Sequence, residues 1–291
     1  MKCLYLSQKG TGAYNEDVII EVNANKKYFW IFDGATPIFK NIMVADYGSS
    51  AEWLVKELSN KMMKIIKKFP DIDFLILLKK AINTLLKDEG TLISRFNVND
   101  FPSFTMVAAV TSKYFTTFYV IGDCVAHILN TNRQMITLTD QRYEKYDHEL
   151  TIFRNSHNMQ NTEDKDKYVN KRLEIKSYMN KENGFWLGTI NKDWINKNQI
   201  KVIKMANNTI SKFFLCSDGF SRLLKIFPEI SPFDVLSEKL SLKTYLSKIR
   251  NAEKTNHSLL NNWSKESDDA SAMLVEDINV SGYISINLDT N

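Results

Sequence analysis

The sequence YFWIFDGAT, residues 28–36, runs five aromatic or branched side chains straight into Asp33 and Gly34. A short continuous apolar run of this kind is consistent with a strand that is buried on both faces. Asp-Gly after a strand normally marks a turn, because aspartate hydrogen-bonds its own backbone and glycine accepts positive φ. The stretch therefore predicts a central strand that delivers a carboxylate to the edge of its sheet.

The same arrangement recurs along the chain. Four further acidic elements fall at predicted strand ends: Glu16-Asp17 before a strand, Asp123 in a hairpin turn, Asp218 after the apolar run 213–216, and Asp268-Asp269 before the last strands. Each one alone is an ordinary turn. Together they raise the question of whether the carboxylates converge on one site or diverge to solvent.

Convergence would have a direct electrostatic consequence. Two like charges about 4 Å apart repel by about 4 kcal/mol at an effective dielectric constant of about 20, so such a cluster would require cations. Ligand sets made only of oxygen atoms suit Mg²⁺ or Mn²⁺ rather than zinc. Two such ions would lower the pKa of a shared water and clamp a phosphoryl oxygen. That is the chemistry of metal-assisted phosphate ester hydrolysis.

The apolar pattern of the rest of the chain predicts an α+β sandwich, with sheets packed on each other and helices outside. Strands are expected at residues 2–7, 18–22, 28–32, 105–110, 115–121, 126–129, 135–138, 199–205, 209–216, 270–276 and 283–288, and helices at 43–68, 74–96, 220–224 and 232–254. The four strands between 105 and 138 are expected to form one meander. Residues 141–183 are polar and predict a mobile helical insertion without a core of its own.

Composition excludes several classes of protein. The 291 residues are 44% apolar and 25% charged, as in an ordinary globular protein rather than a disordered or fibrous one. The net charge of +4 is spread along the chain and does not indicate nucleic-acid binding. The three cysteines form no CxxC or Cys/His cluster, so neither disulfides nor a zinc site is expected. Without a signal-peptide pattern or a long apolar segment, we expect a cytoplasmic protein with no membrane contact.

Seven short motifs carry a resemblance to a known family. In chain order they are NED at 15–17, FDGAT at 32–36, SFTMVAAV at 103–110, IGDC at 121–124, GFWLG at 184–188, LCSDGF at 215–220 and SDDASAMLV at 267–275. This series resembles the metal-dependent protein phosphatases of the protein phosphatase 2C type, in their short bacterial form. The resemblance covers nearly the whole chain. It implies one catalytic domain over residues 1–291, built as a β-sandwich of two mainly antiparallel sheets flanked by pairs of α-helices, with a flap at about 141–183.

The resemblance also implies a catalytic centre with two ions, Mn²⁺ or Mg²⁺. Asp33 matches the aspartate that bridges both ions, and the carbonyl of Gly34 takes part. Asp218 and Asp268 match the aspartates that complete the first ion. The implied reaction is hydrolysis of phosphoserine or phosphothreonine by a metal-bridged hydroxide, without a covalent phosphoenzyme.

Four more acidic positions have less definite roles. Either Glu16 or Asp17 matches the acidic pair that serves the second ion, and the sequence does not choose between them. Asp123 corresponds to an aspartate that, with Asp218, would support a third and weaker ion. Asp269 stands where the family more often has asparagine, so we expect it to support the ligands rather than bind metal.

The sequence departs from the family at the substrate phosphate. Family members usually carry an arginine shortly before the NED element, where its planar fork can grip phosphate. Here no arginine precedes Arg95, and Gly12 stands at the matching position. Lys9 is a candidate replacement as a point charge, the alternative being an ordinary solvated lysine. The DGAT motif also lacks the histidine that follows DG in many eukaryotic members.

These observations leave three functional hypotheses. The first is a metal-dependent protein serine/threonine phosphatase that acts on a phosphorylated protein and is paired with a serine/threonine kinase. The second, motivated by the missing arginine, is a non-catalytic or weakly active binding and regulatory module. The third is a hydrolase of other phosphoesters. Intact carboxylates favour catalysis, because an unused cluster of repelling acids would only destabilise the fold.

Overall fold

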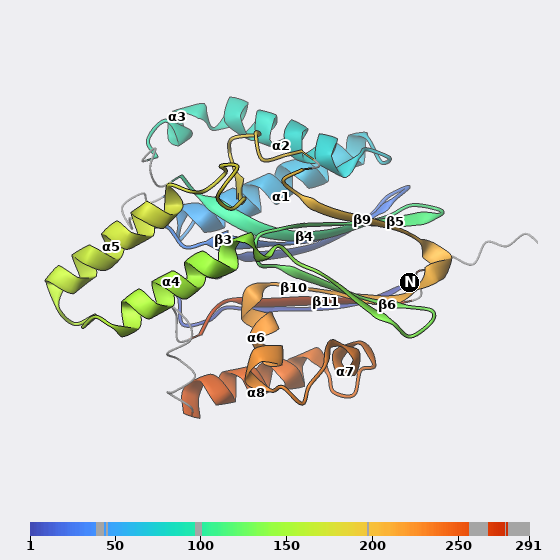
Figure 1. Ribbon diagram of the computed structural model, residues 1–291. Helices are drawn as coiled ribbons and strands as arrows, with labels where there is room; N and C mark the ends of the chain where they lie inside the picture. The colour runs from blue at the N-terminus through green and yellow to red at the C-terminus, as the bar shows by residue number, and fades with distance from the viewer. Residues whose placement is uncertain are drawn as a thin grey trace, which may run out of the picture.

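The computed structural model describes residues 1–38, 44, 46–96, 101–196, 198–255, 267–276 and 278. Two antiparallel sheets stack face to face (Figure 1). One sheet has the order β1 (Lys2–Gln8), β11 (Ala270–Glu276), β10 (Ile210–Cys216), β6 (Val125–Asn130) and β7 (Met135–Leu138). The other has the order β2 (Asp17–Asn23), β3 (Lys27–Ala35), β4 (Ser103–Thr111), β5 (Phe115–Ile121) and β9 (Lys201–Ala206), with the short β8 (Gly188–Thr189) paired to β4.

Strand periodicity divides the apolar side chains between separate cores. Along β3, Phe29 and Ile31 face the other sheet, whereas Trp30 and Phe32 join the core under the first helices. Because side chains alternate across a strand, a run that is apolar at every position serves both faces at once. The continuous apolar run at residues 28–32 is therefore typical of a strand that lies between two cores.

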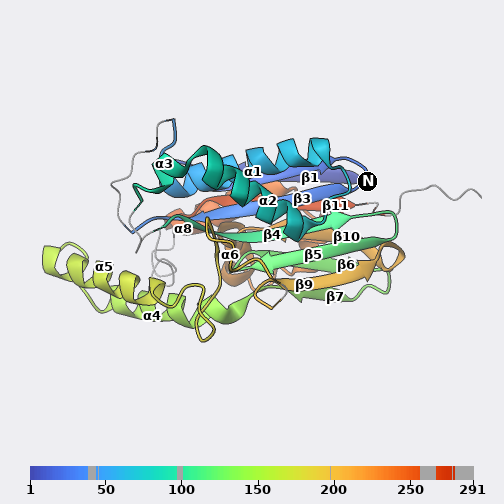
Figure 2. The same cartoon turned by 90° about the horizontal axis from the view of Figure 1, so that it is seen from above.

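Helices cover the outer face of each sheet. Three lie over the sheet that contains β3: α1 (Ser50–Lys68), α2 (Phe74–Asp88) and α3 (Gly90–Ile93). Three lie under the other sheet: α6 (Asp218–Ile226), α7 (Pro232–Leu236) and α8 (Leu242–Thr255). Two more, α4 (Glu144–Asn155) and α5 (Thr162–Lys176), project beyond one end of the sandwich (Figure 2). The expected α+β sandwich of two mainly antiparallel sheets is thus confirmed.

Two predicted helices are interrupted. The segment 74–96 splits at Glu89 into α2 and α3. The segment 232–254 splits into α7 and α8 because Glu238 adopts a φ of 53°, a left-handed conformation that a continuous helix does not allow. Ser241 then accepts a hydrogen bond from the Thr244 backbone N–H at 3.1 Å and opens α8. The predicted strand 283–288 lies outside the described residues.

The predicted meander is wrong. β4 and β5 belong to one sheet, and β6 and β7 belong to the other. Gly122 and Asp123 therefore do not form a hairpin turn but carry the chain from sheet to sheet. Gly122 has a φ of 74°, and a Cβ at this position would lie 2.4 Å from Cγ2 of Thr105. Glycine is thus required by conformation and by space.

The insertion at 141–183 is helical, as predicted, but it has a small core of its own. The buried residues of this core are Tyr146, Leu150, Ile175, Phe185 and Leu187. The Tyr146 and Phe185 rings lie 5.1 Å apart between centroids. Polar composition concealed this cluster because only two or three apolar residues in each helix contribute to it. Within the described part of the chain, every helix is too short or too polar to cross a lipid bilayer.

Candidate functional site

The predicted acidic residues meet at one end of the sandwich. Asp17 on β2 stands directly opposite Asp33 on β3 in the strand register. Asp218 is the first residue of α6, directly after β10. Asp268 precedes β11, and Asp123 lies on the crossing from β5 to β6. This is the end from which α4 and α5 project (Figure 1).

Asp17 and Asp33 lie in the most strongly repulsive environment of the cluster. Burial and the negative charges of Asp17 and Asp218 raise the pKa of Asp33 well above its usual range. Burial also raises the pKa of Asp17, against hydrogen bonds from serine hydroxyls that lower it. One of these is the bond from Ser217 Oγ to Asp17 Oδ2, at 3.0 Å. No described residue gives the buried Asp17 Oδ1 a hydrogen bond.

Glu16 has a different role from Asp17. Its carboxylate accepts hydrogen bonds from Thr36 Oγ1 at 2.6 Å and from Ser49 Oγ at 2.5 Å. Ser49 is also the N-cap of α1. Glu16 therefore links the exit of β3 to the start of α1, and the geometry favours Asp17 as the member of the acidic pair that serves the cluster.

Gly34 allows β3 to pass close to the loop before β2. Its backbone N–H donates to the Glu16 carbonyl at 3.0 Å, and a Cβ at this position would lie 2.9 Å from that carbonyl oxygen. A side chain here would push the two strands apart. The glycine thus keeps Asp33 in register with Asp17.

A buried arginine, which sequence reasoning missed, reaches Asp268. The Arg222 side chain on α6 is 4% exposed, and its Nη2 lies 3.3 Å from Asp268 Oδ2. Its Nη1 lies 3.0 Å from Oε1 of Glu253, a buried residue of α8. The predicted ligand Asp268 therefore already faces a fixed cation. Position offered one signal: Arg222 follows Asp218 by four residues, so one helical turn brings it back to the same face.

Asp147 is a second residue that sequence reasoning missed. It lies on α4 and, with Asp123, Asp218 and Asp268, lines a cavity of about 280 Å³. Burial and the charge of Asp218 raise the pKa of Asp147. Burial and the charges of Asp218 and Asp147 raise the pKa of Asp123 to about 7. The projecting helices thus add a carboxylate to the cluster.

Asp269 holds the N-terminal loop against the site. Its Oδ1 accepts from the Gly10 backbone N–H at 2.8 Å, and its Oδ2 accepts from the Glu16 backbone N–H at 2.6 Å. This is the supporting role expected for it. Lys9 follows the same loop, but its exposed ammonium donates to the Ala13 carbonyl at 3.3 Å, and it lines a separate groove with Arg250 and Glu253.

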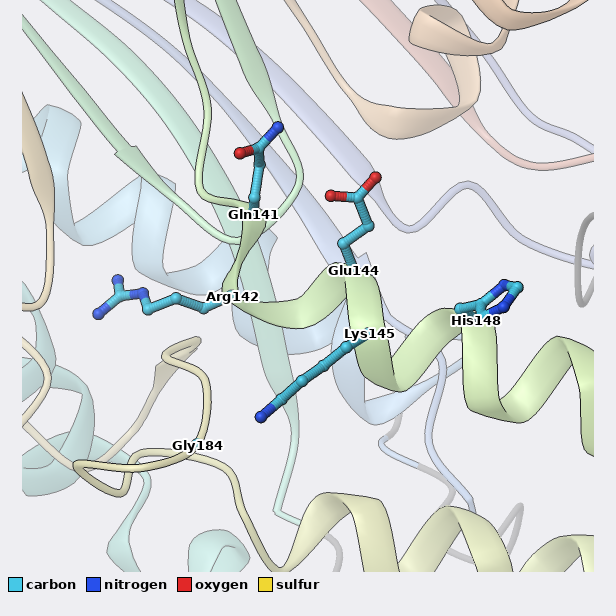
Figure 3. Close-up of a pocket in the computed structure, with 6 residues that line it drawn as sticks. All are labelled: Gln141, Arg142, Glu144, Lys145, His148 and Gly184. Carbon is cyan, nitrogen blue, oxygen red and sulfur yellow. The ribbon is translucent and has the colours of Figure 1, made fainter.

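A second, more open groove lies beside the insertion. It measures about 510 Å³ and is lined by residues of the insertion, including Gln141, Arg142, Glu144 and His148. Figure 3 shows Gln141 and Glu144 pointing to one side of this segment and Lys145 to the opposite side. The predicted aspartates do not line it.

Two cysteines lie close to the predicted aspartates in the sequence, Cys124 after Asp123 and Cys216 before Ser217. Neither forms a disulfide, and burial raises the pKa of both thiols, as expected for buried reduced cysteines.

The donor set fits a hard divalent cation in chemistry. All candidate side chains are carboxylates, and the buried Asp17 Oδ1 has an unused lone pair. As the side chains are placed, no group of three or more His, Cys, Asp or Glu residues within the described ranges forms a ready-made ion site. Rotation of the carboxylates toward one another would be needed to surround an ion.

Comparison with known proteins agrees with this architecture. Residues 7–264 match the family described as Protein phosphatase 2C. The chain belongs to the protein phosphatase 2C family. The predicted family is thereby confirmed, although no curated protein sequence matches the chain.

Solved structures of bacterial phosphatases share the fold. A bacterial serine phosphatase has 13% sequence identity and a TM-score of 0.53, with 95% of this chain and 97% of that chain covered. The catalytic domain of the serine/threonine phosphatase PstP, in complex with two manganese ions, has 12% identity and a TM-score of 0.50, covering 94% and 97%. A serine/threonine phosphatase from Staphylococcus aureus has 13% identity and a TM-score of 0.51, covering 95% and 94%. At these identities the likeness shows the fold alone.

Proposed function

We propose that this chain is a metal-dependent protein serine/threonine phosphatase that hydrolyses phosphoserine or phosphothreonine in a protein substrate, itself phosphorylated by a partner serine/threonine kinase. One observation carries the proposal: five separate chain segments bring Asp17, Asp33, Asp123, Asp218 and Asp268 to the same end of the sandwich. Membership of the protein phosphatase 2C family supports the reaction class. The manganese complex of a structural relative supports the kind of ion.

The residues that would hold the ions are Asp33 with the Gly34 carbonyl, Asp17, Asp218 and Asp268, with Asp123 beside a third and weaker position. Bound there, Mn²⁺ or Mg²⁺ supplies Lewis acidity and charge neutralisation for phosphate ester hydrolysis. The chain contributes position: the Asp17–Asp33 register, the Ser217 hydrogen bond and the close approach at Gly34 keep the carboxylates on rigid strand ends.

Other residues of this chain shape the site. Arg222 holds one oxygen of Asp268 and thereby limits its rotation. Lys9 remains a candidate for contact with the substrate phosphate, which requires its ammonium to leave the Ala13 carbonyl. Asp147 lines the cavity next to the cluster from the projecting helix α4.

The test is hydrolysis of a phosphothreonine peptide after chelator treatment, with and without added Mn²⁺, using the Asp33→Asn variant alongside. We expect turnover only with the metal, and a loss of at least about a hundredfold in the variant, because one of the carboxylates that would hold the ions is removed. Unchanged turnover in Asp33→Asn would refute the assignment of Asp33.

Two observations favour the alternative of a weakly active binding module. The Arg222 guanidinium competes with a cation for Asp268, and the family's phosphate-gripping arginine is missing. In that case the protein would bind Mn²⁺ in calorimetry but release no phosphate from any peptide. Metal binding together with metal-dependent turnover would exclude this alternative.

A further inference from the structure

We propose that the 280 Å³ cavity beside the carboxylate cluster is a recognition pocket for a basic side chain, arginine or lysine, located near the phosphorylated residue of the substrate. The inference rests on the proposed function and adds the substrate class to it. The cavity is enclosed by α4 of the projecting pair, by the β6–β7 hairpin and by α6. Its carboxylate wall is shared with the candidate catalytic site, so a peptide bound there would reach both.

The floor of this pocket contains a buried acceptor. His127 on β6 is 4% exposed, and its ring stacks on Phe214 with 5.9 Å between centroids. Its Nδ1 lies 3.0 Å from Thr137 Oγ1, whereas no described residue offers its Nε2 a hydrogen bond. A buried polar atom without a partner is uncommon in a folded protein, and this one belongs to a residue that lines the cavity.

The protonation state of His127 determines what it can bind. Burial lowers its pKa to about 4, so the ring is neutral at physiological pH. When Nδ1–H donates to Thr137, Nε2 is a hydrogen-bond acceptor. Guanidinium and ammonium groups only donate hydrogen bonds, so they complement this atom.

The charges around the pocket favour the same ligand. Asp140 is paired with Arg142 at 2.5 Å, and Arg222 is engaged by Glu253 and Asp268. In contrast, neither Glu144 nor Asp147 forms an ion pair within the described part of the chain, although both line the pocket. Lys225, which is exposed, is the compensating charge that lines it. After ions neutralise the predicted ligands, an acidic surplus would remain on α4.

Size and surroundings fit one side chain rather than a larger ligand. The cavity is slightly smaller than the roughly 300 to 1,000 Å³ typical of pockets for drug-sized molecules. Apolar stems of arginine and lysine would contact Val125 and Leu224, which also line the cavity. A donor head could then reach the carboxylate of Asp147, and a shift of the His127 ring would be needed to bring Nε2 to it.

The experiment compares pairs of phosphothreonine peptides. The two peptides of a pair differ at one position, which is either arginine or its uncharged isostere citrulline. The positions tested are the two residues before and the two residues after the phosphothreonine. With Mn²⁺ present, we expect the arginine peptide to have about tenfold higher kcat/KM at one or more positions. Asp147→Asn and His127→Phe should bring this ratio close to one. Because the ratio of kcat/KM between the arginine and citrulline peptides is taken within one variant, a general loss of activity does not change it. His148→Phe, which lines the neighbouring groove, is the matched control and should retain the wild-type ratio.

Equal kcat/KM for arginine and citrulline at every position would overturn the pocket while leaving the phosphatase proposal intact. A preference that persists in both Asp147→Asn and His127→Phe would also overturn it. If no peptide is hydrolysed, the proposed function fails, and the same peptide pairs are then compared by calorimetry. Tighter binding of the arginine peptide that is lost in Asp147→Asn would support the pocket, and equal binding would reject it.

Discussion

The two ends of the sandwich differ in the polar groups that lie where the strands end. At the end away from the projecting helices, a buried amide closes the turns. Asn207 accepts from Thr116 Oγ1 at 2.8 Å and donates to the Ser112 carbonyl at 2.8 Å. Its own backbone N–H donates to the Tyr114 carbonyl at 2.9 Å. Neutral hydrogen bonds thus satisfy this end of the molecule from within.

The other end gathers carboxylates, and burial together with neighbouring negative charges raises the pKa of Asp17, Asp33 and Asp123 among them. A neutral amide network stabilises a strand end, whereas a cluster of like charges destabilises it unless a cation is present. The amide end therefore stabilises the fold by itself, whereas the carboxylate end is suited to binding a cation. Substitutions at the two ends should therefore have opposite effects on stability.

The largest stability effect is expected at the amide end. Asn207→Ala would remove one of the two partners of the buried Thr116 hydroxyl, which keeps Thr111, and the donor shared by the Ser112 and Lys113 carbonyls. We therefore expect the free energy of unfolding to fall by about 2 to 3 kcal/mol. Turnover should change little, because the carboxylates lie at the opposite end. Urea unfolding measures the effect. Asn130→Ala, which removes exposed hydrogen bonds to Gln134 at the same end, is the control and should lose less than about 1 kcal/mol. Equal losses would show that burial of the amide is not what matters.

Asp123→Asn should raise the free energy of unfolding of chelator-treated protein, whereas Asn207→Ala lowers it. The folded state holds the Asp123 proton up to about pH 7, whereas an unfolded chain releases it near the ordinary value of 3.8. The native state therefore binds more protons across that window, and wild-type stability falls as pH rises through it. Removing the charge should raise stability at pH 8 by about 1 to 2 kcal/mol, since partial exposure screens the repulsion.

Thermal unfolding at pH 5 and pH 8 measures this change. The gain from Asp123→Asn should be larger at pH 8 than at pH 5, and saturating Mn²⁺ should reduce it. A variant that is less stable than wild type at pH 8 would mean that the carboxylate end is not repulsive.

The smallest effect is expected for Gly12→Arg, which restores an arginine at the family's position. A Cβ at Gly12 meets only the Tyr14 carbonyl oxygen, at 3.4 Å, so the substitution should be tolerated. If the site lacks a side chain that hydrogen-bonds the substrate phosphate, the new arginine should lower KM for a phosphothreonine peptide about three- to tenfold at similar kcat. Gly12→Leu controls for side-chain bulk. An unchanged KM would place phosphate binding on other residues.

The sequence was sufficient for much of this description. Apolar runs at every position identified β3 and β10 as doubly buried strands, and their terminal aspartates do lie together. The different contacts of Glu16 and Asp17 needed coordinates, because the sequence does not fix where β2 begins or how it pairs with β3.

Other features were hidden for physical reasons. Gly122-Asp123 has the composition of a hairpin turn, and sequence alone does not distinguish a return within one sheet from a step between sheets. Asp147 and Arg222 lie on helices whose pattern reports only which face is apolar. Their approach to the cluster depends on how α4 and α6 pack, which local periodicity does not encode.

The position of β11 affects how the protein is made. β1 pairs with β11 alone in the sheet order, and Asp269, just before β11, anchors Gly10 and Glu16. β1 therefore cannot complete its pairing until β11, which follows more than 250 residues later in the chain, has been synthesised. Contacts of such sequence separation form late in folding. The carboxylate cluster can assemble only when synthesis has passed β11, so a shorter nascent chain would lack a complete candidate site.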